Sequence, residues 1–222
     1  MTATLVRPSG TARGQRPWTA VVAGLSVAVA AGAAFLPAWP AGPDMGSTNY
    51  MGLLAANQPW NLILFMAIPV VLAETVAVTE LAVLFSRGGA RRSALVNRWA
   101  GLVAGLYFLG VTSYLMVHAV VPLTRDGGWR GPADVIAVGF YLLGLVPLYG
   151  MTLLETRAVG ADLDDDTRRK VHAWMVGAFL VVAHIAMIFG MLDPTVLGWT
   201  ADQAPPTHTM PGGTVMHGGT HG

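Results

Sequence analysis

The chain has 222 residues, of which 54% are hydrophobic and only 11% are charged. Soluble domains carry about 25% charged residues, so this chain has too few solvating side chains for a typical soluble enzyme or a disordered regulator. A formal net charge of +1 and the absence of cysteine also exclude a strongly basic nucleic-acid-binding domain, disulfides and thiolate metal sites. The composition therefore predicts an integral membrane protein.

Five stretches are long and apolar enough to cross the hydrocarbon core of a bilayer, which takes about 20 helical residues. They cover residues 18–39, 60–85, 99–121, 135–154 and 171–192. They lack the two-residue alternation of a membrane β-barrel, and recurring small residues such as Gly101, Gly105 and Gly110 allow close helix packing. The sequence predicts an all-α membrane bundle over residues 18–192, with a basic arm (1–17) before it and a tail (193–222) after it.

The basic residues predict the orientation of these spans. Eleven of the thirteen lie in the arm, in the connection between the second and third spans, and in the connection between the fourth and fifth. Because basic loops stay on the cytoplasmic side, we expect a multi-pass protein of the inner (plasma) membrane with its N-terminus inside and its C-terminus outside. The first span could instead be a cleaved signal peptide, although its apolar run exceeds the roughly 7–15 residues of such a segment.

The second span carries two carboxylates, Glu74 near mid-depth and Glu80 nearer the cytoplasm. Six residues turn a helix by about 600°, which leaves these side chains roughly 120° apart around the axis. We expect this helix to lie inside the bundle, where the two carboxylates form a proton or cation relay or orient a metal-binding histidine. The alternative is a structural role in helix packing. Pro69 removes one backbone hydrogen bond, to Phe65, and predicts a bend above Glu74.

Histidine, tyrosine and methionine add polar and soft donor atoms to the third and fifth spans. Tyr114 and His118 lie on one polar stripe of the third span. His184 in the fifth span is followed on the same face by Met187 and Met191, three and seven residues later. Imidazole and thioether groups suit copper, especially Cu(I), whereas ordinary core packing of methionine is the alternative.

Two histidines at similar depth on facing helices can hold a haem b. His118 and His184 both lie in the outer half of their spans, so they could be the axial ligands of one haem. His172 lies at the cytoplasmic mouth of the fifth span without an obvious partner, so a second haem of this kind is not expected.

The tail is rich in proline and glycine and has no periodic apolar face, which predicts disorder. It nevertheless concentrates possible copper ligands, namely His208, Met210, Met216, His217 and His221. A flexible tail with such residues can gather copper outside the cytoplasm, and a chance composition or the remnant of a tag is the alternative.

Three segments, NQPWNLILFMAIPVVLAETVAVTELAVLF, GGWRGPADVIAVGFYLLG and VVAHIAMIFGMLDP, together resemble a family of small bacterial multi-pass membrane proteins that is described only as a domain of unknown function. The resemblance covers about residues 50–199 and leaves out the first span and the tail. It implies that Glu74, Glu80, His118 and His184 lie in the core of the family, and it implies no activity.

Three functions remain open from the sequence. The first is a protein that binds or moves copper through the tail and an intramembrane Glu/His/Met site. The second is an electron-transfer subunit that holds a haem b between His118 and His184, and the third is a non-catalytic subunit of a larger membrane complex. The chain contains no nucleophile elbow, phosphate loop or HExxH sequence, so the sequence gives no support for an enzyme.

Overall fold

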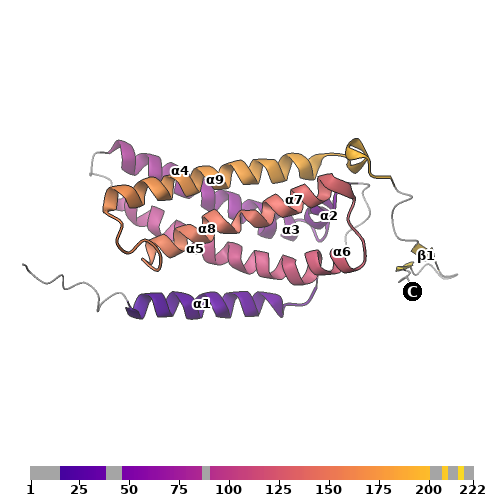
Figure 1. Cartoon of the computed structure of the whole chain (residues 1–222), viewed down its shortest axis with the longest axis horizontal. Helices are drawn as coiled ribbons and strands as arrows, with labels where there is room; N and C mark the ends of the chain where they lie inside the picture. Colours follow the sequence, from indigo (N-terminus) through magenta and orange to yellow (C-terminus); the bar gives the residue numbers. More distant parts are fainter. Residues whose placement is uncertain (1–15, 39–46, 87–90, 201–206, 210–214, 218–222) are drawn as a thin grey trace, which may run out of the picture.

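The computed structural model describes residues 16–38, 47–86, 91–200, 207–209 and 215–217. In these ranges the chain forms a bundle whose helices run along the long axis of the molecule (Figure 1). Nearly all of the predicted basic arm lies outside the described residues.

Within the described residues, four helical segments are long and apolar enough to cross a membrane. They cover Trp60–Phe85, Arg91–Arg125, Gly131–Glu155 and Asp165–Met191. Each exceeds the length that a bilayer requires, which confirms the all-α membrane class predicted from the sequence. The first predicted span corresponds to α1 (Arg16–Ala34), whose apolar part, Trp18–Ala34, is shorter.

Three of the four long segments are divided into shorter elements. The first contains α3 (Trp60–Leu62), the π-helix η1 (Ile63–Ala67) and α4 (Ile68–Phe85), and the second contains α5 (Arg91–Leu115), the π-helix η2 (Met116–Val120) and α6 (Val121–Arg125). The third contains α7 (Gly131–Leu143) and α8 (Leu145–Glu155), whereas α9 (Asp165–Met191) is continuous. Pro69 and Pro122 follow the two π-helices because proline has no N–H for the preceding turn.

The irregularity predicted at Pro69 is the π-helix η1, where two tyrosines donate hydrogen bonds to backbone carbonyls. Because proline has no N–H, Pro69 donates no hydrogen bond to the preceding turn. The Tyr107 hydroxyl of α5 donates to the carbonyl of Leu64 at 2.8 Å, and the Tyr141 hydroxyl of α7 donates to the carbonyl of Phe65 at 2.5 Å. These bonds fix α5 and α7 against the middle of the first long segment.

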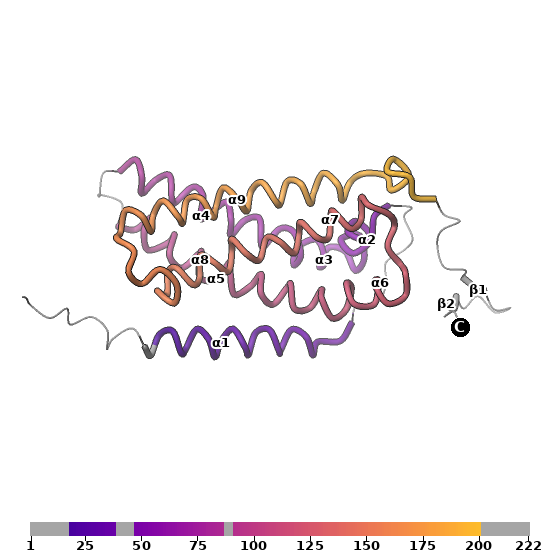
Figure 2. Tube along the Cα trace, viewed as in Figure 1, coloured from indigo at the N-terminus to yellow at the C-terminus, as the bar shows by residue number. Residues whose placement is uncertain are grey.

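The helices surround α5, which packs against α1, α4 and α8, while α9 packs mainly against α7 and α8. Helix α1 therefore lies on one outer side of the bundle and α9 on the opposite side, as the tube view shows (Figure 2). One core cluster is centred on Phe108, Leu148, Met151 and Phe179, where α5, α8 and α9 meet. The contact of α9 with α4 is less extensive, and this contact borders the candidate site.

Glycine allows the close contact between α5 and α8. A Cβ atom at Gly105 would lie 2.1 Å from Oγ1 of Thr152 and 2.5 Å from the carbonyl oxygen of Leu148. The Thr152 hydroxyl also donates to the carbonyl of Gly101 at 3.3 Å. The predicted role of these small residues in close packing is confirmed at Gly105.

Polar side chains join the connecting segments at the end of the bundle that holds α2 (Asn49–Ala55). Asp134 is fully buried and accepts hydrogen bonds from the backbone N–H groups of Asn49 at 2.8 Å and Arg130 at 3.2 Å. Thr48 caps the N-terminus of α2 and also donates to the carbonyl of Gly190 on α9 at 2.5 Å. A buried carboxylate is thus fully hydrogen-bonded where the loops meet the helices.

The segment predicted as a disordered tail contains three short described elements. Residues Pro194–Leu197 form the 3₁₀-helix η3. The strands β1 (Thr207–Thr209) and β2 (Val215–His217) pair in antiparallel register, with His208 opposite Met216.

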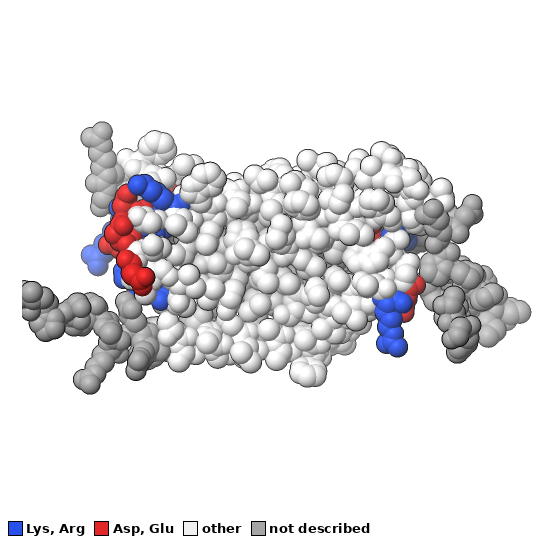
Figure 3. All heavy atoms as spheres, viewed as in Figure 1, with Lys and Arg blue, Asp and Glu red and all other residues white. Residues whose placement is uncertain are grey.

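Charged side chains lie at the two ends of the bundle and leave an uncharged belt between them on the face in view (Figure 3). The end formed by the start of α5, the end of α8 and the start of α9 carries most of them, and it is called the basic end below. Five of its basic residues are Arg91, Arg98, Arg157, Arg169 and Lys170. Such a belt is the surface that a hydrocarbon environment requires.

Candidate functional site

A pocket of about 250 Å³ lies between α4, α7 and α9 at mid-height of the bundle. Its walls are mainly aromatic and apolar, with Phe65, Pro69, Phe108, Phe140, Tyr141 and Phe179 among the lining residues. Glu74 and His184 line the same pocket, so the structure brings together two of the residues predicted for an intramembrane polar site. Pockets with apolar walls and few polar groups are typical of small-molecule binding sites.

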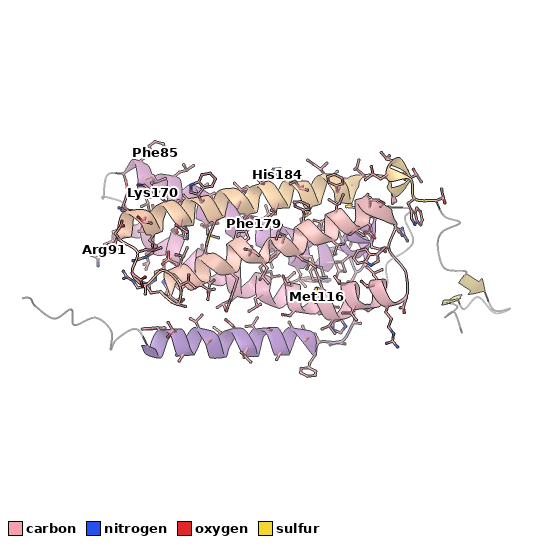
Figure 4. The ribbon with its side chains drawn as sticks, in the orientation of Figure 1. Phe85, Arg91, Met116, Lys170, Phe179 and His184 are labelled. Carbon is pink, nitrogen blue, oxygen red and sulfur yellow. The ribbon has the colours of Figure 1, made fainter. Side chains whose placement is uncertain are left out.

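His184 has one ring nitrogen bonded and the other free. Its Nδ1 atom lies 2.6 Å from the carbonyl oxygen of Leu180, one turn earlier in α9, so Nδ1 carries the hydrogen of this bond. The neutral ring then presents the lone pair of Nε2, which can accept a hydrogen bond or bind a metal ion. The side chain is exposed, and Figure 4 shows it at the outer edge of α9.

Glu74 is exposed on α4 at the border of the pocket. Among the described residues it has no hydrogen-bond or ion-pair partner. The neighbouring hydroxyl of Thr75 donates instead to the carbonyl of Val71 on its own helix. The two carboxylate sides of α4 therefore differ, since protein covers Glu80 whereas Glu74 borders an open pocket. A carboxylate in the apolar belt is costly without a polar partner, so this position favours occupation by another molecule.

Glu80 does not line the pocket and lies in a separate buried group at the basic end. Its Oε2 atom accepts a hydrogen bond from Nδ2 of Asn97 at 2.9 Å and lies 2.9 Å from Nδ1 of His172. The sequence indicated no partner for His172, and Asn97 was not among the candidate residues. A sequence signal was available, because Glu80, Asn97, Glu155 and His172 all lie near the basic ends of their helices and therefore at similar depth.

Tyr114 and His118 also lie away from the pocket. Their rings are 4.6 Å apart, and the Tyr114 hydroxyl is 3.4 Å from the carbonyl oxygen of Pro37, just after α1. His118 therefore does not share a site with His184, because neither Tyr114 nor His118 lines the pocket. The structure thus divides the five predicted residues among three places: Glu74 with His184 at the pocket, Tyr114 with His118, and Glu80 at the basic end.

The predicted metal ligands are only partly assembled. Met187 lines the pocket with His184, whereas Met191 is 69% exposed and does not line it. Within the described ranges no group of three or more histidine, aspartate or glutamate side chains has the arrangement of a metal site. In the tail, Met210 and His221 lie outside the described residues, while His208, Met216 and His217 lie on the two short strands.

The chain matches the model of a family of unknown function, DUF6803, over residues 45–206. The match covers well over half of the chain, and the protein therefore belongs to this family. It begins after α1, as the resemblance predicted, and it extends further at the other end, to residue 206. No curated protein and no solved structure matches the chain.

Proposed function

We propose that this protein is an integral membrane protein whose lateral pocket binds a small lipophilic molecule with a polar, ring-sized head group. The single observation that supports this function best is that Glu74 and His184 line one aromatic-walled pocket while both side chains are exposed in the apolar belt. A bound head group with hydrogen-bonding groups would cover both, and this removes the cost of a bare carboxylate in hydrocarbon.

The dimensions of the pocket favour a head group with its tail outside. Sites for whole drug-sized ligands measure about 300–1,000 Å³, and this pocket of about 250 Å³ holds little more than a substituted ring. Aromatic walls favour a planar ring through offset and edge-to-face contacts. A quinone-like or phenolic ring whose apolar tail remains in the bilayer matches both features.

The topology that we propose has five spans, with α1 as the first. The basic end faces the cytoplasm, because basic residues are retained there, and this orientation places the N-terminus inside and the tail outside the inner membrane. The mouth of the pocket then lies at mid-depth in the bilayer, about 20 Å along the helix from Trp60.

Binding of a short-chain benzoquinone to the detergent-purified protein tests this function. We expect saturable binding that is weakened at least about tenfold by Glu74→Gln and by His184→Gln, since each change removes one polar contact worth about 1.4 kcal/mol or more. His118→Gln is the matched control, because the same substitution is made outside the pocket. Binding that all four proteins share equally, or no saturable binding, rejects the proposal.

A copper site at the same place is the second candidate, because Glu74, His184 and Met187 together provide oxygen, nitrogen and sulfur donors to one pocket. In this function the tail delivers Cu(I) to the pocket. Competition with a chromogenic Cu(I) chelator distinguishes the two functions. Met187→Leu lowers copper stoichiometry if the site is a copper site and leaves quinone binding nearly unchanged.

The remaining two hypotheses receive less support. A haem b with His118 and His184 as axial ligands receives less support because His118 does not line the pocket that contains His184. A non-catalytic subunit remains compatible with the exposed carboxylate if another membrane protein covers Glu74. In that case Glu74→Leu abolishes co-purification of the partner and no small molecule competes with it.

A further inference from the structure

A second group of ionisable side chains is buried at the basic end, separate from the pocket. His172 of α9 is 4% exposed and Glu80 of α4 is 7% exposed. The His172 ring lies between two carboxylates: its Nδ1 atom is 2.9 Å from Oε2 of Glu80, and its Nε2 atom is 3.9 Å from Oε1 of Glu155 on α8. The three side chains form a row that crosses the bundle from α4 through α9 to α8.

The two ends of this row differ in their access to water. At the inner end Glu80 is held by Asn97 of α5, whose Nδ2 atom donates to it at 2.9 Å and to the carbonyl of Val76 at 3.2 Å. At the outer end the Glu155 side chain is 23% exposed, and its Oε2 atom is 3.7 Å from Nε of Arg98, which is 60% exposed. The row therefore connects water at the basic end with a carboxylate that water does not reach.

The ring nitrogens of His172 are not hydrogen-bonded in the way expected of a side chain that only stabilises helix packing. Both ring nitrogens are buried and neither is in hydrogen-bond geometry, although carboxylate oxygens lie on both sides. Buried polar groups that only fix packing are normally hydrogen-bonded, so free nitrogen atoms between two carboxylates require another reason. Space is also available beside the ring, because a Cβ at Gly101 would lie 3.6 Å from Nε2, at ordinary contact distance.

Other charged groups near this row are paired elsewhere. At the start of α9, Arg168 lies 3.3 Å from Asp165, and Arg169 lies 4.0 Å from Asp166. The charged groups that face His172 are accordingly Glu80 of α4, Glu155 of α8 and, through Glu155, Arg98 of α5.

We propose that Glu155, His172 and Glu80 form a proton-transfer row, which carries a proton from water at the basic end to the Glu80 carboxylate. A proton from water binds the Glu155 carboxylate and passes to Nε2 of His172, directly after a small side-chain movement or through one water molecule. The ring then gives its Nδ1 proton to Oε2 of Glu80. The balance is one proton gained by Glu80 and one lost by water. Glu155 and His172 have their initial charges after these transfers, and rotation of the ring brings its remaining proton back to the Glu80 side.

The row lies apart from the pocket and provides a proton-binding site that is accessible from the basic end. Imidazole between two carboxylates suits such a transfer because one nitrogen accepts a proton while the other donates one. Asn97 is the positioning residue, since its hydrogen bond fixes the oxygen of Glu80 that faces the ring.

Infrared difference spectra of the full chain in nanodiscs, recorded between acidic and neutral pH, test the row. We expect a carboxylic-acid C=O band that is absent from Glu80→Gln and that loses its fast hydrogen–deuterium exchange in His172→Gln. Glu74→Gln is the matched control, and it leaves the Glu80 band unchanged. A Glu80 carboxylate that stays ionised throughout the pH range of the folded protein overturns the proposal, and so does an exchange rate that His172→Gln leaves unchanged.

A second measurement remains decisive if His172→Gln does not fold. In a chain that keeps His172 as its single histidine, with the other five changed to Gln, ring ¹⁵N shifts report directly on this side chain. We expect both nitrogen signals to change together over the pH range in which the Glu80 band changes. Signals that stay constant over that range identify a structural ion pair and reject the transfer row.

Discussion

Two carboxylates on one helix, six residues apart, have opposite surroundings in this protein. Glu80 is buried at the basic end, where Asn97 and His172 contact it, whereas Glu74 is exposed at the pocket and has no partner among the described residues. The rotation of about 120° between them places one toward α5 and α9 and the other toward the rim of the pocket. The bundle thus provides its own partners for Glu80 and leaves Glu74 open at the pocket.

The largest effect that we expect is loss of stability on changing Glu80 to Leu. This removes one partner of a buried pair and leaves Nδ1 of His172 and Nδ2 of Asn97 without the carboxylate that faces them, which costs about 3–5 kcal/mol. Glu74→Leu is the matched control, and its free energy of unfolding stays within about 0.5 kcal/mol of the original or rises. Reversible unfolding in mixed micelles, followed by circular dichroism, measures both. Equal losses in the two variants would remove the distinction between the regions.

Gly105→Ala tests the packing that holds the buried row in place. The added methyl group overlaps Thr152 and the carbonyl of Leu148, so α5 and α8 must separate, at a cost of about 1–3 kcal/mol. Gly139→Ala is the control on α7, because its Cβ meets no atom within 4 Å. The same unfolding assay applies, and a Gly105→Ala protein as stable as the control would contradict the close α5–α8 contact.

Tyr141→Phe tests the wall of the pocket. The change leaves the carbonyl of Phe65, which Pro69 cannot bond, without its hydroxyl donor, and we expect a loss of about 1 kcal/mol. Tyr107→Phe should lose a similar amount, since it removes the donor to Leu64. If the pocket is a binding site, Tyr141→Phe also alters quinone affinity, whereas Tyr107→Phe does not, because Tyr107 does not line it. Unchanged stability in both variants would show that the π-turn needs neither donor.

The smallest effect concerns a carboxylate outside both regions. Asp164 is the N-cap of α9, and its pKa is lowered by hydrogen bonds from Thr167. The bond from the backbone N–H of Thr167 has the larger effect, and the bond from its hydroxyl has the next largest. Because the folded-state pKa lies below the unfolded one, the cap stabilises the helix above the unfolded pKa and is lost as the pH falls through the folded pKa. Amide exchange at the start of α9 should therefore rise in acid, and Asp164→Ala should show the higher exchange already at neutral pH. A start of α9 that exchanges alike in both proteins at neutral pH would exclude this cap.

Much of the membrane domain could be predicted from the sequence because hydrocarbon imposes strict conditions on composition and length. The second span was predicted with the bounds of the observed helical segment, 60–85, since charges and prolines limit it on both sides. The other long helices extend beyond the predicted spans, since a helix continues through charged turns after the apolar run ends. The irregularity at Pro69 was also predictable, because a missing N–H is a local property.

The candidate site was predictable only as a set of residue types. Periodicity places His184 and Met187 on one face of a helix and separates Glu74 from Glu80, but it does not say which helices are neighbours. The structure therefore divides the predicted polar site, placing Tyr114 with His118 beside the end of α1 and Glu80 with His172. Glu80 and His172 lie at similar depth along their helices, which is consistent with their pairing. Depth alone, however, does not identify which of several side chains at that level contacts His172.

The sequence by itself determined that this protein has the composition of a membrane protein, where its four long apolar helices lie, and that one of them is irregular at Pro69. These properties follow from transfer free energies and backbone hydrogen bonds, which act within a segment. Only the tertiary structure decided which carboxylate is paired and which is exposed, because that depends on the rotation of α4 against α5 and α9. Contacts between residues far apart in the chain fix this rotation, such as the hydrogen bonds that Asn97 of α5 donates to Glu80 and to the carbonyl of Val76 on α4.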